Sequence, residues 1–149
     1  MKAVIQRVTS ASVAVDGKTI SEIAAGFLIL LGVEKGDGED DLHYLVKKTV
    51  GLRIFKDDNN NMNLSILDVG GEALVVSQFT LCADTSRGRR PSFIYAASPK
   101  EADQMYQQYC EQLISNGVQV QTGKFGAMMD VALVNDGPVT IIIESGNTH

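Results

Sequence analysis

Hydrophobic and polar residues alternate along the first third of the chain, as they do in strands with one buried face. Residues 2–8 and 12–15 alternate in this way, and residues 18–23 repeat the pattern after Asp16-Gly17. An Asp-Gly pair between two alternating segments is typical of a two-residue hairpin turn. Residues 27–33 are almost uniformly apolar, which indicates a central strand covered on both faces. The pattern therefore predicts that the chain opens with antiparallel strands.

Helical spacing of apolar residues occurs twice. The first helix is predicted from the recurrence of Leu42, Leu45, Val46, Thr49 and Val50 behind the acidic residues Glu39, Asp40 and Asp41, which suit a helix N-terminus. The second is predicted from about Ser98 to Asn116, with Ser98 as N-cap, Pro99 at the first helical position, Glu101 completing a capping box and Gly117 as the stop. Its buried stripe would be Ala102, Met105, Tyr106, Tyr109 and Leu113.

Further strands are predicted at residues 52–55, 73–81, 118–121, 130–134 and 139–144. Strands thus outnumber helices, and no repeat or linker divides the chain. A length of 149 residues with 44% hydrophobic content suits one core. We expect an α/β fold of the α+β kind: one compact domain over residues 1–149, with a large, mixed, mostly antiparallel sheet in two layers and two main helices packed on one side.

Composition narrows the classes of protein. Cys82 and Cys110 lie far apart and outside any CxxC spacing, so we expect free thiols in a reducing compartment. Neither a signal peptide nor an apolar segment of about 20 residues is visible, which predicts a cytoplasmic protein away from membranes. The net charge of −5 argues against a protein that coats nucleic acid, although Arg87, Arg89 and Arg90 form one compact basic cluster.

The usual catalytic groups are missing. The chain has two histidines, of which His43 falls within a predicted helix and His149 is the last residue, and neither GxSxG nor HExxH occurs. An EF-hand-like spacing of Asp57, Asn59, Asn61 and Asp68 departs from the calcium motif, because Met62 replaces the turn glycine and Asp68 the bidentate glutamate. We interpret residues 57–61 as a polar turn and predict neither a metal nor a cofactor.

Two short segments carry the functional signal. Ser77-Gln78-Phe79-Thr80-Leu81 places polar groups at the end of an apolar strand, and Asn135-Asp136-Gly137-Pro138-Val139-Thr140 lies between two predicted strands. Taken singly, the first could be hydrogen-bonded strand residues and the second an ordinary tight turn. Together, in this order and about sixty residues apart, they resemble the signature segments of the D-aminoacyl-tRNA deacylase (D-tyrosyl-tRNA deacylase) family. The resemblance extends over the whole chain, including the opening residues 1–8 and the loop from Arg87 to Pro91.

The resemblance implies hydrolysis of the ester bond of D-aminoacyl-tRNA, with release of the D-amino acid and free tRNA. In that family the terminal ribose hydroxyl of the RNA and a backbone amide are thought to assist the reaction in place of a side-chain nucleophile. By position, Phe79 would give its amide N–H to the developing oxyanion. Ser77 and Gln78 would shape the pocket, and Thr80, which lacks a nearby base, would have a positioning role.

Selection of the D-enantiomer is the second implication. Enantiomers carry the same groups, so only a rigid steric clash can separate them. The resemblance assigns this clash to Gly137 and Pro138, as a Gly-cis-Pro turn that enters the pocket of the partner subunit in a homodimer with two sites. A pocket that only excludes an L side chain should admit glycine, so glycyl-tRNA, including glycine mischarged on tRNA-Ala, is an expected substrate. The sequence leaves the isomer of the Gly137–Pro138 bond open.

The basic cluster allows two interpretations. Arg87, Arg89 and Arg90 could contact acceptor-stem phosphates of the tRNA, or they could be a solvated charge cluster on a surface loop. Two other functions also remain open: a non-catalytic module that binds aminoacyl-tRNA, and an editing domain for an L-aminoacyl-tRNA.

Overall fold

A long hairpin starts the fold in the computed structural model, which describes residues 1–146. Strand β1 (Lys2–Val15) pairs antiparallel with β3 (Gly26–Gly32) along its first half and with β2 (Lys18–Ile23) along its second half. The turn between β1 and β2 has positive φ at Asp16 and Gly17, 51° and 78°, as the hairpin prediction requires. The two alternating segments predicted at residues 2–8 and 12–15 are thus one continuous strand.

The rest of the main sheet is built on both sides of this hairpin. Strand β8 (Asp130–Glu144) pairs antiparallel with the other edge of β1, while β6 (Glu72–Ser77) runs parallel to β3 and β7 (Gln119–Thr122) runs parallel to β6. The sheet is therefore mixed, as predicted. Phe27, Leu28 and Ile29 of β3 are all buried, which confirms that this strand is central and covered on both faces.

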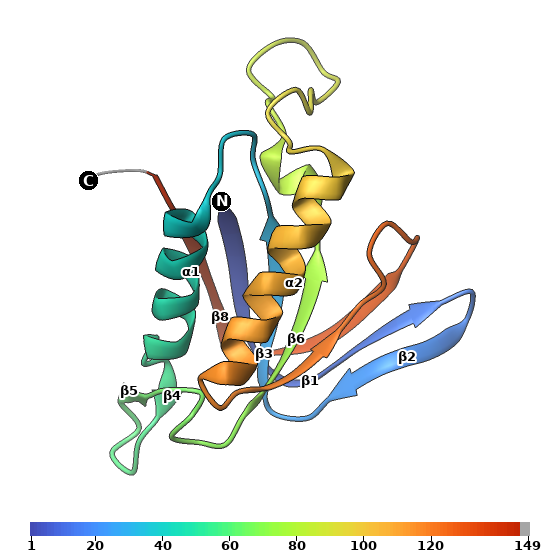
Figure 1. The fold of residues 1–149 in the computed structure, drawn as a ribbon. Coiled ribbons are helices and arrows are strands. Elements are labelled where there is room, and N and C mark those ends of the chain that lie inside the picture. The colour runs from blue at the N-terminus through green and yellow to red at the C-terminus, as the bar shows by residue number, and fades with distance from the viewer. Residues whose placement is uncertain (147–149) are drawn as a thin grey trace.

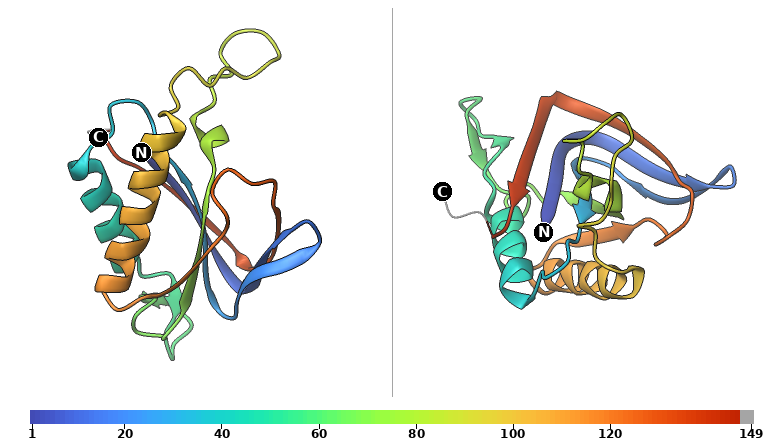
Figure 2. Two further views of the ribbon diagram at one scale, coloured as in Figure 1. Left: turned by 45° about the vertical axis from the view of Figure 1, so that its right-hand side comes forward. Right: turned by 90° about the horizontal axis from the view of Figure 1, so that it is seen from above.

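Helices cover one face of the sheet, and the sheet itself curls over the other (Figures 1 and 2). Helices α1 (Glu39–Gly51) and α2 (Pro99–Ser115) pack on β1, β3 and β6 to form the main core. A second core lies on the opposite face, where the far halves of β1 and β2 and the start of β8 lie over β3 and β6; its buried members are Val8, Ala11, Val13, Ile23, Leu28, Leu74 and Val76. The two β layers and one helical layer confirm the predicted α/β architecture.

The ends of α2 follow from its sequence. The Ser98 hydroxyl accepts a hydrogen bond from the Glu101 amide at 3.3 Å, Pro99 takes the first helical position, and Gly117 leaves the helix with a φ of 96°. The predicted stripe is correct: Ala102, Tyr106, Tyr109 and Leu113 are buried and Met105 packs against the core. In α1, His43 lies on the exposed face, whereas Leu42 and Leu45 are buried.

Three predicted strand boundaries are wrong. The strand predicted at residues 73–81 ends at Ser77, because the Val33 carbonyl that follows β3 (Gly26–Gly32) accepts from the Ala97 amide instead; residues Phe79–Cys82 form a short 3-10 helix, η1. The strand predicted at 52–55 is the two-residue β4 (Phe55–Lys56), which pairs with β5 (Met62–Leu64) outside the main sheet. The strands predicted at 130–134 and 139–144 are parts of the single strand β8.

The loop that resembles a calcium site is a turn between β4 and β5 whose polar groups hydrogen-bond to one another. One carboxylate oxygen of Asp57 accepts hydrogen bonds from the amides of Asn59 and Asn61, at 2.9 and 3.0 Å, and the other accepts from the Asn63 side chain. Across residues 1–146, no three His, Cys, Asp or Glu side chains gather as metal ligands. Both cysteines are buried and free. No helix in this range is long and apolar enough to span a bilayer.

Candidate active site

The first signature segment lies where β6 stops. The amide of Gln78 makes the last ladder bond, to the Leu31 carbonyl at 2.8 Å, and the chain then turns into η1. The first amides of a helix lack intrahelical acceptors. Among residues 1–146, nothing accepts a hydrogen bond from the N–H of Phe79. This donor is therefore available to a ligand.

The side chains of this segment are only lightly constrained. The Gln78 amide nitrogen donates to the Thr80 hydroxyl at 3.0 Å, and both groups are exposed. No histidine or carboxylate contacts the Thr80 hydroxyl among the residues that are described, so nothing there acts as a base toward it. The ring of Phe79 is 56% exposed and meets the ring of Phe93 edge-on, with 5.0 Å between centroids. Among the described residues, Thr80 thus has no neighbouring group that would activate its hydroxyl as a nucleophile.

A pocket of about 390 Å³ adjoins this segment on the face of the sheet that carries the second core. Its polar lining comes from Ser77, Gln78 and Gln6. Its apolar lining is formed by Leu28, Leu30, Val76, Ala127, Met128, Met129, Val131 and Leu133. A polar edge on an apolar hollow is the usual composition of a small-molecule site.

The second signature segment interrupts the pairing of β8 with β1 without ending the strand. Gln6 pairs with Thr140 and Val8 pairs with Asn135, so residues 136–139 bulge out opposite a single residue of β1, Arg7. The segment is therefore not the tight turn between two strands that its sequence alone suggests. The Gly137–Pro138 peptide bond is cis, Gly137 has a φ of 139°, and both residues are exposed.

Two side chains hold this bulge in place. The Asn135 side chain accepts from the Val139 amide at 2.7 Å and donates to the Val139 carbonyl at 3.2 Å, which closes the segment on itself. Arg7, only 2% exposed, donates through Nε to the Asp136 carbonyl at 3.0 Å and through Nη1 to the Ile54 carbonyl at 2.5 Å. Nε also lies 3.4 Å from the Asp136 carboxylate. The residues that flank exposed Gly137 and Pro138 are thus held in place by hydrogen bonds.

Sequence reasoning overlooked Arg7 and Gln6. The alternation that buries Ala3 and Ile5 also places Arg7 on the inward face of β1. A charged residue at a buried position indicates that it has a buried partner. Gln6 lines the pocket and also donates to the Thr140 hydroxyl at 3.3 Å, so it connects the two segments. Gly137 and Pro138 are not among the residues that line the pocket of their own chain.

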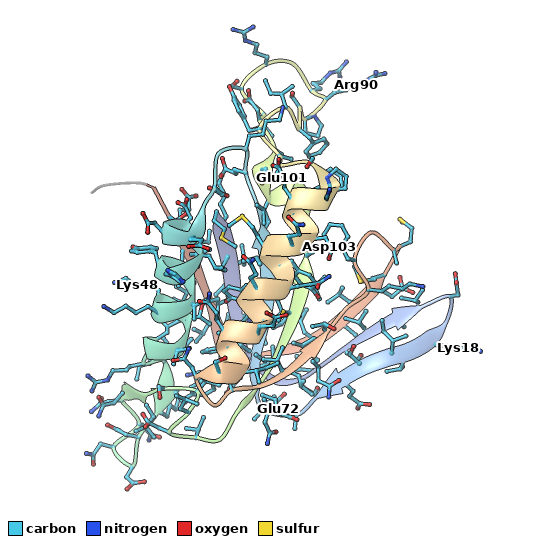
Figure 3. The ribbon with its side chains drawn as sticks, viewed as in Figure 1. Lys18, Lys48, Glu72, Arg90, Glu101 and Asp103 are labelled. Carbon is cyan, nitrogen blue, oxygen red and sulfur yellow. The ribbon has the colours of Figure 1, made fainter. Side chains whose placement is uncertain are left out.

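The arginine cluster lies in a loop that projects from one end of the molecule (Figures 1 and 3). Reciprocal backbone hydrogen bonds between Asp84 and Ser92, at 2.7 and 2.9 Å, close the base of this loop. Arg87, Arg89 and Arg90 are exposed, and no carboxylate among residues 1–146 pairs with them. The pKa of Asp84 is lowered by hydrogen bonds from Ser86, which hold it as a carboxylate. The positive charge of the tip is therefore not neutralised by a contact.

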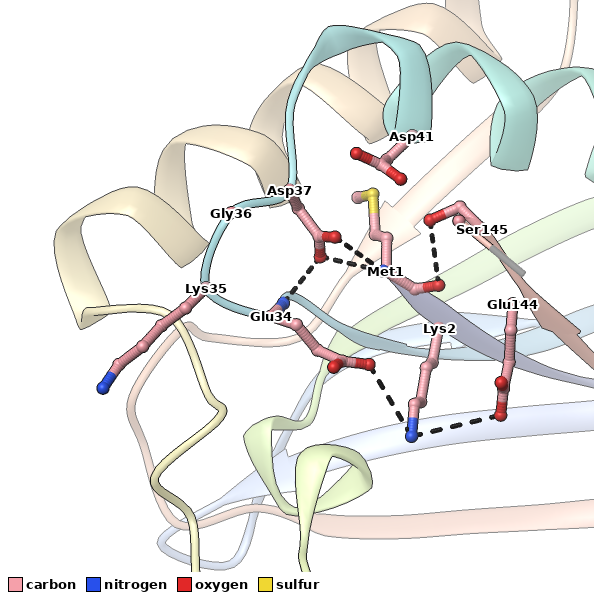
Figure 4. Close-up of a pocket in the computed structure, with 10 residues that line it drawn as sticks. Met1, Lys2, Glu34, Lys35, Gly36, Asp37, Asp41, Glu144 and Ser145 are labelled. Carbon is pink, nitrogen blue, oxygen red and sulfur yellow. Dashed lines mark hydrogen bonds and ion pairs between the residues drawn. The ribbon is translucent and has the colours of Figure 1, made fainter. Parts of the chain in front are cut away.

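A second pocket, of about 360 Å³, surrounds Met1 and contains none of the predicted site residues (Figure 4). The Met1 amino group pairs with Asp37 at 2.8 Å, and Lys2 lies between Glu34 and Glu144 at 3.6 and 4.0 Å. Most of its charged groups therefore pair with one another. We assign it a structural role at the junction of β1, β8 and α1.

Comparison with known proteins identifies the family of this chain. The family model described as D-Tyr-tRNA(Tyr) deacylase matches residues 4–144. The D-aminoacyl-tRNA deacylase of Desulfatibacillum aliphaticivorans is 57% identical over 145 residues, covering 97% of this chain and 99% of the relative. That of Natranaerobius thermophilus is 53% identical over 146 residues, covering 97% of each.

Solved structures share the fold over nearly the full length. A structure titled c-Myc DNA Unwinding Element Binding Protein superposes with a TM-score of 0.94 at 42% identity, covering 99% of this chain and 100% of the other. A probable eukaryotic D-amino acid tRNA deacylase superposes with a TM-score of 0.82 at 15% identity, covering 96% and 98%, and shares the fold. Together with the matching family model, the high identity of the full-length relatives establishes that this chain belongs to the D-Tyr-tRNA(Tyr) deacylase family.

Proposed function

We propose that this protein hydrolyses the ester bond of D-aminoacyl-tRNA, releasing the D-amino acid and free tRNA. Its relatives bear the name of this activity. The observation that carries the proposal is the unpaired N–H of Phe79, which follows directly on the pocket-lining residues Ser77 and Gln78. A fixed backbone donor beside a pocket can stabilise the oxyanion that forms when an ester carbonyl is attacked.

The chemistry proceeds without a side-chain nucleophile in this proposal. Water attacks the ester carbonyl with assistance from the vicinal hydroxyl of the terminal ribose, and the negative charge that develops on the carbonyl oxygen receives the Phe79 N–H. The carbon–oxygen bond to the ribose then breaks, and the ribose oxygen takes up a proton. Ser77 and Gln78 shape the pocket edge, and Thr80, held by Gln78 at 3.0 Å, positions the segment.

Chiral selection in this proposal uses the partner subunit of a homodimer. Exposed Gly137 and Pro138 would enter the partner's pocket, contact the amino group of the substrate and leave no room for an L side chain. Among residues 1–146, the only strand that pairs with β8 is β1, and Val134 and Ile142 of β8 are 56% and 66% exposed, which supports an interface on this side of the sheet. A pocket of this kind admits glycine, so glycyl-tRNA is a further expected substrate.

Contact with tRNA is assigned to the projecting loop. Arg87, Arg89 and Arg90 carry unneutralised charge on an acidic body of net charge −5, which suits a local contact with phosphates rather than general nucleic-acid binding. A protein acting on aminoacyl-tRNA belongs where translation occurs, so we propose a cytoplasmic location.

One assay tests the function. The protein is mixed with D-tyrosyl-tRNA, L-tyrosyl-tRNA and glycyl-tRNA, and loss of each ester is followed against the spontaneous rate. Selective loss of the D-tyrosyl and glycyl esters is expected. Loss of none would indicate a binding module, and loss of the L-tyrosyl ester alone would indicate an editing domain. Complete resistance of glycyl-tRNA beside cleavage of D-tyrosyl-tRNA would refute the exclusion model.

A further inference from the structure

Phe79 and Phe93 form an aromatic pair that belongs to neither hydrophobic core. Their ring centroids are 5.0 Å apart and the rings meet at 71°, while Phe79 is 56% exposed. Phenylalanine side chains are usually buried, whereas Phe79 is exposed and Phe93 is half-buried, so the pair leaves ring surface open for a ligand. We propose that this pair is a stacking platform for the unpaired bases that precede the terminal adenosine of the tRNA acceptor end. The inference rests on the proposed function.

The platform has positive charge beside it. The backbone pairing of Asp84 with Ser92 joins the base of the arginine loop directly to Phe93, the next residue along the chain. Figure 3 shows Arg90 at the far end of this loop, directed away from the body. Phosphates attract arginine, and bases of any sequence stack on aromatic rings, so rings next to unpaired arginines match a single RNA strand.

The order of the groups also matches a strand that ends in the pocket. The Phe79 N–H faces the reacting ester in the proposed function, so the side chain of the same residue lies next to the nucleotide that carries the ester. Along a bound RNA strand, the rings of Phe79 and Phe93 would come next, and the loop with Arg87 and Arg89 would follow them. Exposed Ile94 and Tyr95, at 59% and 53%, extend the apolar surface after Phe93. The ester would therefore contact the Phe79 amide, the bases would contact the two rings, and the phosphates would contact the guanidinium groups of the loop.

The test compares two substrates that differ in the nucleotides assigned to the platform. D-tyrosyl-tRNA contains them, and D-tyrosyl-adenosine, with the ester on the ribose, does not. Phe93→Leu keeps an apolar side chain but removes the ring, so kcat/KM for D-tyrosyl-tRNA should fall by about ten-fold, within the range for loss of one base–aromatic stack. Hydrolysis of D-tyrosyl-adenosine should stay within about two-fold of wild type. Phe93→Tyr, which retains the ring, should keep both activities.

Controls separate stacking from other roles of Phe93. Tyr44→Leu removes an exposed aromatic ring on α1, outside this surface, and should change neither activity. Equal losses on both substrates would mean that Phe93 only supports the Phe79 backbone, and unchanged activity on both would mean that no base stacks there; each result overturns the platform. A change of oligomeric state in Phe93→Leu, measured by sedimentation, would assign the pair to a subunit interface and also overturn it. If the wild type hydrolyses neither substrate, the proposed function fails and the platform fails with it.

Discussion

Arg7 holds Asp136 from the neighbouring strand: its Nε lies 3.0 Å from the Asp136 carbonyl oxygen and 3.4 Å from the Asp136 carboxylate. The same guanidinium group donates to the Ile54 carbonyl, so one buried side chain connects the exposed Gly137–Pro138 segment to the loop after α1. A planar group with several fixed donors can serve these acceptors together, which lysine cannot do. The position of the proposed chiral element therefore depends on a residue outside both signature segments.

Replacing Arg7 should loosen the bulge and destabilise the fold. Arg7→Met leaves the Ile54 and Asp136 carbonyls without their donor, and we expect the free energy of unfolding in urea to fall by about 2–4 kcal/mol. Any folded variant should also lose discrimination between D- and L-tyrosyl-tRNA. Arg53→Met is the control, because the Arg53 side chain is exposed and, within residues 1–146, donates its hydrogen bonds to Asn63. Equal stability of Arg7→Met and wild type would contradict this account.

Gly137 should not tolerate a side chain. A Cβ at this position would lie 2.7 Å from the Val139 side chain and 3.0 Å from its amide nitrogen, and the φ of 139° is unfavourable for other residues. We expect Gly137→Ala to displace the bulge and reduce kcat/KM for D-tyrosyl-tRNA by at least about ten-fold, the effect of misplacing a positioning group. Gly36→Ala is the matched control, since Gly36 also has positive φ, 88°, but open space around it. Similar activity in both variants would argue against a role for this geometry.

The role of the Phe79 amide can be tested by removing only its hydrogen. Proline is tolerated at the first position of a helix and lacks the N–H, so Phe79→Pro should retain η1 while kcat for D-tyrosyl-adenosine falls by about 100- to 1000-fold. Phe79→Ala keeps the donor and loses the ring, and we expect a much smaller loss on this short substrate. Comparable kcat values for the two variants would show that the amide is not the oxyanion donor.

The stability of the protein at acid pH should depend on Asp41, a carboxylate in the first turn of α1. The Gly38 amide donates to Asp41 at 2.9 Å, and this bond lowers the pKa of Asp41 from its ordinary value of 3.8. A lowered folded-state pKa stabilises the protein above pH 3.8, and this stabilisation is lost as the pH falls through the folded-state value. Asp41→Ala should lower the free energy of unfolding by about 0.3–1 kcal/mol at pH 7 and by progressively less below pH 4. Thermal unfolding across this pH range measures the difference. Asp40→Ala removes a carboxylate from the same turn without this bond and should show the weaker pH dependence.

Local patterns were sufficient where neighbours in the sequence decide the structure. The turn at Asp16-Gly17, the buried strand around Phe27 and the Ser98 cap could all be predicted, because turn geometry, burial and capping depend on a few adjacent residues. The family was also predictable, since its two segments are short and linear. Their residue types carry the resemblance without knowledge of what surrounds them.

The tertiary structure decided everything that depends on a distant partner. Strand β6 ends at Ser77 because the Val33 carbonyl, just beyond β3, accepts from the Ala97 amide rather than from β6, and the Phe79 amide is left without a ladder partner. The Gly137–Pro138 segment is a bulge rather than a turn between strands because β8 stays paired with β1 on both sides of Arg7. Long-range hydrogen bonds of this kind join residues more than a hundred positions apart. No local sequence pattern specifies which two will meet.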